Sequence, residues 1–287
     1  KMDDPESRPI IKPSQGIHIV LDKSFLPGDS AIMVPHTDDG RVLFAIPWHD
    51  KVLVGTTDTE LDHVELEPAA LEEEVEFLIV HAARYLTKDP TRKDVLSVFA
   101  GLRPLITSED ALATAALSRD HSLSISRSGL VTIAGGKWTT YRKMAQDTVK
   151  QAAMIARLDP MECVTKTLHI HGYHKHAVRF GDLALYGSDA SQIQDLMREK
   201  PEYGERLSQD LSVYAAEVIW AVRHEMARTI EDFLSRRTRS LLLNAKASLD
   251  MAPRVADLMA KELGLGKRWK KAQLSAYQEL AKGYVLA

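Results

Sequence analysis

Cysteine is nearly absent from this sequence, whose 287 residues include only Cys163. One thiol cannot form an internal disulfide or a cysteine-based metal cluster, and its rarity fits a reducing compartment. Long hydrophobic runs are also absent, so the sequence predicts no membrane-spanning helix. The formal net charge of −3 gives no overall reason to expect nucleic-acid binding.

A glycine fingerprint for dinucleotides is missing as well. No G-x-G-x-x-G follows a predicted strand, so we expect no complete nucleotide-binding domain. Because the chain starts at Lys1, we expect it to be a fragment of a longer protein. Its charge is uneven: from residue 223 onward 13 Lys and Arg stand against 7 Asp and Glu, or +6, which leaves −9 for the rest.

What the sequence does contain is first a set of strands. Alternating side chains and turn residues predict strands over 16–22, 30–34, 41–46, 51–55 and 94–100. Asp38–Asp39–Gly40 is a turn signal between two of them, which favours an antiparallel meander. A helical period covers 67–86, and a hairpin pairs 122–126 with 130–133.

The second half of the sequence is helical. After a connector over 163–180, periodic segments cover 211–225, 230–236, 253–263 and 269–284. Asp189 with Gln192, and Thr229 with Asp232, have the spacing of a capping box. The sequence therefore predicts an α+β fold, with a mostly antiparallel sheet in a first domain (1–160) and an all-α bundle in a second (161–287).

Residues 129–145, GLVTIAGGKWTTYRKMA, combine a strand, a turn at Gly135 and Gly136, and a helix capped by Thr139 or Thr140. The first N–H groups of a helix have no internal partner, so this corner can face a planar or anionic ligand, and Lys137 adds a positive charge there. Taken alone, these residues favour the simpler interpretation of an ordinary turn with a solvated lysine.

Further side chains are candidates for chemistry. Arg103 precedes Pro104, which favours extended backbone and an outward guanidinium suited to a phosphate or carboxylate; a surface ion pair is the alternative. His18 lies on an apolar strand, where a histidine is usually a bonded core residue but can accept a proton. Thr56, Thr57 and Asp58 form a polar turn whose hydroxyls and carboxylate can orient a ligand, although a simple strand-ending turn is the default interpretation.

Four histidines lie between His169 and His176 in the connector. Their spacing is compatible with zinc, but no matching cysteine or carboxylate set accompanies them. We therefore predict no metal site.

Six motifs occur in order along the chain: GIHIV, AIPWHD, VGTTDTE, GLRPL, SRDHSL and AGGKWTTYRKMAQDT. Together they resemble the FAD-dependent glycerol-3-phosphate dehydrogenases, closest to the quinone-linked enzymes of bacteria and mitochondria. The resemblance covers nearly the whole chain, including SRRTR at 235–239. It implies that residues 1–160 are a substrate-binding cap with the last part of the FAD-binding domain, and that the N-terminal FAD fingerprint is missing.

The resemblance also implies roles for the candidates. Arg103 and Lys137 correspond to cations of the glycerol 3-phosphate pocket, which Thr57 also lines. His18 corresponds to a histidine near the hydroxyl that is oxidised, so the expected catalytic residues are His18, Arg103 and Lys137. Gly135, Gly136, Lys137, Thr139 and Thr140 correspond to the loop against the flavin ring.

The expected activity is oxidation of sn-glycerol 3-phosphate to dihydroxyacetone phosphate with FAD and transfer of electrons to quinone. We expect the full-length protein to be cytoplasmic and peripherally membrane-associated through its basic tail. Formation of a homodimer is an equally good role for that tail. We expect the fragment alone to be inactive. One alternative is a glycerol-3-phosphate oxidase that uses oxygen. Another is a non-catalytic interaction module whose basic helical tail binds a partner or a membrane surface.

Overall fold

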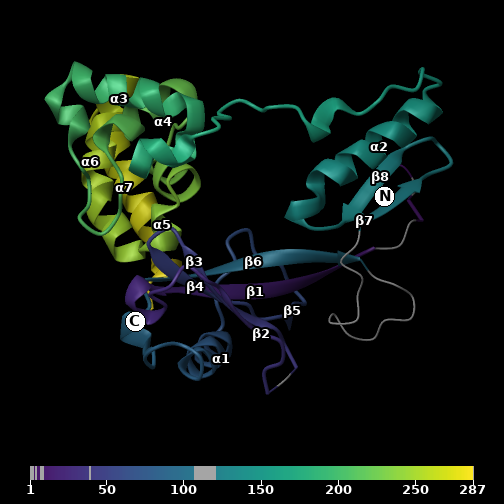
Figure 1. Ribbon diagram of the computed structural model, residues 1–287, viewed down its shortest axis with the longest axis horizontal. Coiled ribbons are helices and arrows are strands. Elements are labelled where there is room, and N and C mark those ends of the chain that lie inside the picture. The colour runs from purple at the N-terminus through teal and green to yellow at the C-terminus, as the bar shows by residue number, and fades with distance from the viewer. Residues whose placement is uncertain (1–2, 4, 7–9, 39, 107–120, 287) are drawn as a thin grey trace. The chain divides into compact units, whose positions relative to one another are not determined.

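The computed structural model describes residues 3, 5–6, 10–38, 40–106 and 121–286. These fold into two compact units (Figure 1). Unit 1 comprises Lys1–Gly16, Asp58–Pro68 and Gly101–His169, and unit 2 comprises Ile17–Thr57, Ala69–Ala100 and Ile170–Ala287. The linear boundary after residue 160 stays a prediction. Residues 118–120 of the SRDHSL motif lie outside the described residues.

An antiparallel meander forms the predicted sheet. Its strands are β1 (Ile11–Asp22), β2 (Ile32–Val34), β3 (Leu43–Trp48) and β4 (Lys51–Gly55). The strand order is β2-β3-β4-β1, and all neighbouring pairs are antiparallel. The meander is therefore confirmed, because branched residues alternate in these strands and a turn lies between β2 and β3.

Two further strands pair with β1. The short β5 (Thr59–Glu60) was not predicted; Ser14 pairs with Glu60 and Gln15 with Thr59. Strand β6 (Ser97–Ile106) also pairs with β1 and continues past the predicted end at residue 100. It therefore contains Pro104, which an edge strand tolerates because a missing N–H there need not break a ladder.

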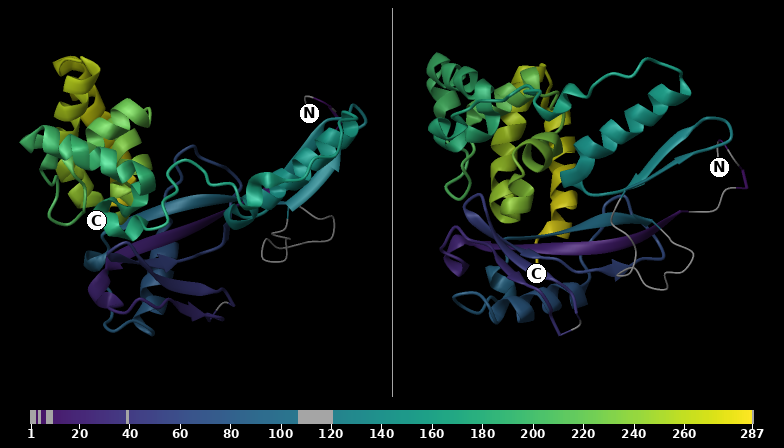
Figure 2. Two further views of the ribbon diagram at one scale, coloured as in Figure 1. Left: turned by 45° about the horizontal axis from the view of Figure 1, so that its top comes forward. Right: turned by 45° about the vertical axis from the view of Figure 1, so that its right-hand side comes forward.

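Helix α1 (Glu72–Ala83) covers one face of this sheet in Figures 1 and 2 and is shorter than the predicted 67–86. Its Leu78 and the strand residues Ile17, Ile19 and Leu21 are fully buried in one core. These three strand residues share a face, as alternation along a strand requires.

The C-terminal region is the predicted helical bundle. Its helices are α3 (Ala190–Glu199), α4 (Ala215–His224), α5 (Ser240–Leu243), α6 (Ala245–Leu263) and α7 (Lys267–Ala281). Its fully buried large side chains include Phe233, Ile219, Leu234 and Tyr277. No described helix is both long and apolar enough to cross a bilayer.

Short helical turns connect these elements. They are Lys23–Phe25, Arg92–Asp94, Trp138–Thr140, Val164–Lys166, Ala177–Asp189, Pro201–Gly204 and Lys282–Tyr284, with a π-helical turn at Asp232–Arg237. At the last of these the predicted capping box is confirmed, because Asp232 N donates to Thr229 Oγ1 (3.0 Å) and Thr229 N donates to the Asp232 carboxylate (2.9 Å). At Asp189 the predicted cap position is correct, but the side chain makes no capping bond.

The prediction that a helix starts at Pro253 was wrong. Helix α6 begins eight residues earlier, where Asn244 accepts a hydrogen bond from Ala247 N at 3.1 Å. Proline usually interrupts a helix interior. Here the burial of Met251 and Val255 in the bundle core stabilises the helix around it.

Within unit 2 the bundle packs on the sheet face opposite α1, as both views of Figure 2 show. Ala245 N donates to Leu96 O at 3.0 Å, and Ser97 Oγ donates to Leu241 O at 2.9 Å. Trp48 packs on the bundle core. These contacts fix the end of β3 and the start of β6 against α5 and α6.

Unit 1 contains the predicted hairpin, β7 (His121–Ile125) and β8 (Val131–Gly135), followed by α2 (Tyr141–Ile155). The predicted helix is confirmed, but no residue of α2 is buried within the described structure. Val149 is 67% exposed, for example. The hairpin offers a single narrow surface, which is too small to cover the apolar face of a four-turn helix.

Gly187 and Gly181 test whether the close contact between Gly187 and the backbone of Gly172 requires a glycine. Both have positive φ, +55° and +59°. A Cβ on Gly187 would lie 2.9 Å from the backbone carbon of Gly172, whereas Gly181 has open space. We expect Gly181→Ala to lower the free energy of unfolding by about 1 kcal/mol, from backbone strain alone. Gly187→Ala should cost at least about 2 kcal/mol more, because backbone must move. Equal urea midpoints for the two variants would contradict this.

Candidate functional site

Unit 1 contains a cavity of about 340 Å³ that brings Arg103 and Lys137 together. Its lining residues are Leu102, Arg103, Pro104 and Leu105 of β6, and Gly135, Gly136, Lys137 and Trp138 at the end of β8. The two predicted cations are 34 residues apart in sequence, yet they line one opening. The cavity therefore offers two positive charges to a small anion.

Arg103 lies inside β6 rather than after a strand, which corrects the predicted position. Its guanidinium lies against the backbone of Gly16: a Cβ there would be 2.6 Å from Arg103 Cζ. Arg103 Nη1 is 3.7 Å from Asp58 Oδ1, and the two side chains are only 26% and 17% exposed. The guanidinium is thus held between β1, Asp58 and the cavity.

The glycine corner beside Lys137 has the backbone that the sequence suggested. Gly135 and Gly136 have φ of +72° and +81°, a region that glycine adopts without strain. A Cβ on Gly136 would lie 2.8 Å from Met144 Cε, so the side chain of Met144 packs directly against this glycine. A backbone without side chains is left at the cavity rim, and it fits the close approach of a flat ring.

The helix that follows this corner starts with a local hydrogen-bonded turn. Thr140 is the N-cap of α2, as predicted, but its Oγ1 accepts from Lys137 N (3.1 Å) and donates to Lys137 O (2.9 Å). Thr139 is exposed beside it. Trp138, which was not assigned a role, is 85% exposed and stacks on Tyr141 with ring centroids 5.3 Å apart.

His18 and Thr57 belong to unit 2. The imidazole of His18 stacks on Phe99 with centroids 5.4 Å apart. It lies over Gly55, its partner across the sheet, where a Cβ would be 2.7 Å from His18 Nε2. His18 is therefore a half-buried side chain whose ring orientation is fixed by a neighbour without a side chain.

Thr57 is fully buried. It accepts from Ile17 N at 3.0 Å and donates to Glu74 Oε1 at 2.7 Å. Glu74 Oε2 in turn accepts from Leu71 N at 3.1 Å. These bonds tie β1 to the start of α1, so the structure gives Thr57 a structural task, and its predicted substrate contact stays a prediction.

Of the connector histidines, His174 and His176 contact each other, with ring centroids 6.4 Å apart. His171 pairs with Asp189 at 2.7 Å and is 86% exposed, and His174 contacts Phe180. Across the described ranges, no group of three or more His, Cys, Asp and Glu side chains is placed to hold a metal ion.

Sequence reasoning missed Gly16 and Asp58 as partners of Arg103. A glycine inside a strand often marks a close approach of another group, and that signal was available at Gly16. Asp58 follows Thr57 in a turn, and only the pairing of β5 with β1 brings it to Arg103.

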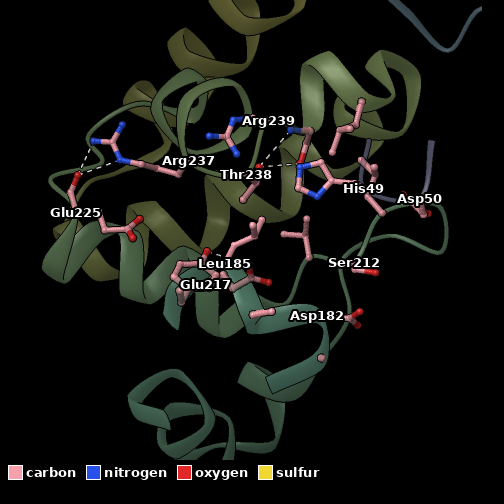
Figure 3. A pocket seen from close by; sticks show the side chains of 17 residues that line it. His49, Asp50, Asp182, Leu185, Ser212, Glu217, Glu225, Arg237, Thr238 and Arg239 are labelled. Carbon is pink, nitrogen blue, oxygen red and sulfur yellow. Dashed lines mark hydrogen bonds between the residues drawn. The ribbon is translucent and has the colours of Figure 1, made fainter. Parts of the chain in front are cut away.

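Unit 2 has a larger cavity of about 580 Å³, which was not predicted (Figure 3). Arg237 and Arg239 lie on one side of it, and Glu217 and Asp182 on the other. Glu217 is 4% exposed and accepts from Tyr186 Oη (2.9 Å) and Tyr214 N (2.6 Å). Burial, together with the nearby carboxylate of Asp182, raises its pKa to about 7.

Comparison with known proteins points to one family. Residues 129–273 match a family model described as the C-terminal domain of alpha-glycerophosphate oxidase, and residues 1–142 match one described as FAD dependent oxidoreductase. The first match covers half of the chain.

Individual relatives agree. The chain is 36% identical over 308 residues to a probable mitochondrial glycerol-3-phosphate dehydrogenase of Caenorhabditis elegans, and 37% identical over 296 residues to the mouse mitochondrial enzyme. The alignments cover 99% and 96% of this chain but only 42% and 40% of those proteins. The chain thus spans less than half the length of these relatives.

A solved structure supports the fold. The glycerol-3-phosphate dehydrogenase from Bacillus halodurans, complexed with FAD, superposes with a TM-score of 0.77 at 29% identity. The match covers 96% of this chain and 58% of that one.

The buried carboxyl of Glu217 gives unit 2 a pH dependence. Its pKa rises from 4.5 to about 7 on folding, so the native state binds the proton more tightly than the unfolded chain. The stability that Glu217 contributes is complete below about pH 4.5 and is lost as pH rises towards 7, by about 3 kcal/mol.

The measurement is urea unfolding of wild type and Glu217→Gln at several pH values. Wild type minus variant should fall by that amount between pH 4.5 and 7, whereas the exposed control Glu279→Gln should show no such trend. Parallel curves for wild type and Glu217→Gln would contradict the assignment.

Proposed function

We propose a function from one premise: the chain belongs to the FAD-dependent oxidoreductases that carry the C-terminal domain of alpha-glycerophosphate oxidase. In the protein that carries it, this chain supplies the substrate pocket for oxidation of sn-glycerol 3-phosphate to dihydroxyacetone phosphate. The observation that carries the proposal is the cavity lined by both Arg103 and Lys137. The names of the relatives point to the same substrate.

Phosphate recognition rests on the two cations. Glycerol 3-phosphate is a small dianion, and a planar guanidinium binds phosphate oxygens with two parallel hydrogen bonds. Arg103 suits this task because Gly16 and Asp58 limit its orientations. Lys137, which lines the same cavity, supplies a point charge to the phosphate or to the reacting end of the substrate.

The glycine corner fits a flavin. We propose that Gly135, Gly136, Lys137, Thr139 and Thr140 hold the ring of FAD, because their backbone has positive φ and leaves no side chain at the rim. FAD held by these residues would supply an acceptor for the hydride of the carbinol carbon. The charge of Lys137 and the start of α2 favour negative charge at this position.

His18 is the proposed proton acceptor. Removal of hydride from a secondary alcohol requires the hydroxyl proton to leave, and imidazole accepts protons near neutral pH. The stack on Phe99 and the space over Gly55 fix the ring, which a base needs in order to meet one hydroxyl. His18 lies two residues after Gly16 on β1, and Gly16 is the glycine that leaves space for Arg103.

The electron acceptor, location and assembly are finer proposals. We propose quinone as acceptor and peripheral attachment to a membrane surface from the cytoplasmic side, supported by the +6 charge of the tail. A homodimer is the other use of that tail. We also propose that the boundary between the two domains follows residue 160.

Oxygen is the competing acceptor. The matched C-terminal domain takes its description from an oxidase. Release of one hydrogen peroxide per substrate oxidised by the holoenzyme would favour the oxidase, and reduction of a soluble quinone without peroxide would favour the dehydrogenase.

The first test changes Arg103 in the holoenzyme. Arg103→Lys keeps the charge but removes the fork, so we expect KM for glycerol 3-phosphate to rise about tenfold, with a smaller change in kcat. Arg127 is exposed in the turn of the hairpin, and Arg127→Lys is the matched control. An unchanged KM in Arg103→Lys would remove the proposed phosphate contact.

A second test uses the chain by itself. Its sequence contains no G-x-G-x-x-G, so we expect it to bind FAD too weakly to retain it, and to be inactive. The check is the absorbance of the purified chain near the flavin bands, followed by equilibrium dialysis against FAD. A yellow preparation with stoichiometric flavin would contradict the expectation.

A further inference from the structure

We propose that Asp58 is a positioning residue for Arg103, and that Gly16, which has no side chain, leaves the space that the guanidinium occupies. The inference rests on the proposed function, because it assigns Arg103 to the substrate phosphate. It adds that Asp58 and Gly16, which are distant from Arg103 in sequence, set the orientation of its guanidinium. All of the residues involved belong to unit 1.

The register of β5 on β1 creates the arrangement. Ser14 pairs with Glu60 and Gln15 with Thr59. The same register carried one residue further brings Asp58 opposite Gly16. The strand pairing therefore delivers a carboxylate beside the one position of this segment that has no side chain.

Gly16 is needed for space rather than for backbone conformation. Its φ is not in the left-handed region, and a Cβ would lie 2.6 Å from Arg103 Cζ. The group that a Cβ would displace is the end of a long side chain, not backbone. Alanine at this position should therefore leave the strand intact and move only the guanidinium.

Asp58 is itself held in place. Ser14 is fully buried and its Oγ donates to Asp58 Oδ1. The same carboxylate oxygen is 3.7 Å from Arg103 Nη1, which is beyond hydrogen-bond range but within that of an ion pair. Ser14 thus orients Asp58, and Asp58 attracts one end of the guanidinium, so the fork cannot rotate freely in the cavity.

Two effects of Asp58 on a dianion oppose each other. Its negative charge weakens the field of Arg103, but its contact removes rotational freedom that the substrate would otherwise have to freeze. Water screens the charge effect, because the cavity is open and both side chains are partly exposed. Two-point recognition of a phosphate depends on orientation, so we infer that positioning dominates.

The test is a set of double-mutant cycles in the holoenzyme. Asp58→Asn and Gly16→Ala should each raise KM for glycerol 3-phosphate about fivefold or more, with kcat changed less. The inhibition constant of inorganic phosphate should rise by the same factor. Asp58→Glu, which keeps the charge, should restore part of the loss.

The cycle separates this inference from the proposed function. In an Arg103→Ala background, where KM is already raised, Asp58→Asn and Gly16→Ala should have no further effect on KM. Matched controls are Asp62→Asn, just after β5, and Gly101→Ala in β6, where a Cβ meets open space. Both controls should leave KM unchanged.

Each outcome of these experiments either supports or overturns the inference. A fall in KM in Asp58→Asn, or an unchanged KM in Gly16→Ala, would overturn the inference while leaving Arg103 as the phosphate ligand. Effects that add fully to those of Arg103→Ala would also overturn it. If Asp58→Asn does not fold, Gly16→Ala still decides, because its urea midpoint should match that of Gly101→Ala. If Arg103→Ala itself has no effect, the proposed function fails.

Discussion

An arginine side chain resting on a glycine of a neighbouring strand is the interaction on which the site depends. Arg103 sits in β6, Gly16 in β1, and the absence of a side chain at Gly16 is what gives the guanidinium its place. From there it lines the same cavity as Lys137. A pocket for a small dianion needs fixed cations, and here the fixing comes from the sheet.

The same arrangement occurs twice in the sheet, with one glycine on β1 and the other on β4. Gly16 leaves space for Arg103, and Gly55, which pairs with His18, leaves space for the imidazole. Glycine weakens a strand because it buries no side chain and loses more backbone entropy. The sheet tolerates both glycines because its other face packs in the hydrophobic core through Ile17, Ile19 and Leu21 of β1 and Val52 and Val54 of β4. Stability on one face thus permits chemistry on the other.

Local patterns predicted most of the elements. Strand β4 has the predicted bounds, and the capping bonds between Thr229 and Asp232 follow from spacing alone. The errors arose where tertiary contacts override local preference. Pro253 lies inside α6 because buried neighbours stabilise the helix, and β5 is too short to have a pattern. Arg103, Lys137 and Asp58 could be predicted as candidates, but the proximity of Asp58 to Arg103 could not, since it depends on strand register.

The central claim is that Arg103 binds the phosphate of the substrate and that Lys137 contacts the same ligand. A crystal structure of the holoenzyme with glycerol 3-phosphate tests it most directly. The account predicts phosphate oxygens within about 3 Å of the Arg103 guanidinium, with Lys137 Nζ on the same ligand. A phosphate bound away from Arg103, with the cavity beside Gly135 and Gly136 filled by solvent, would contradict it.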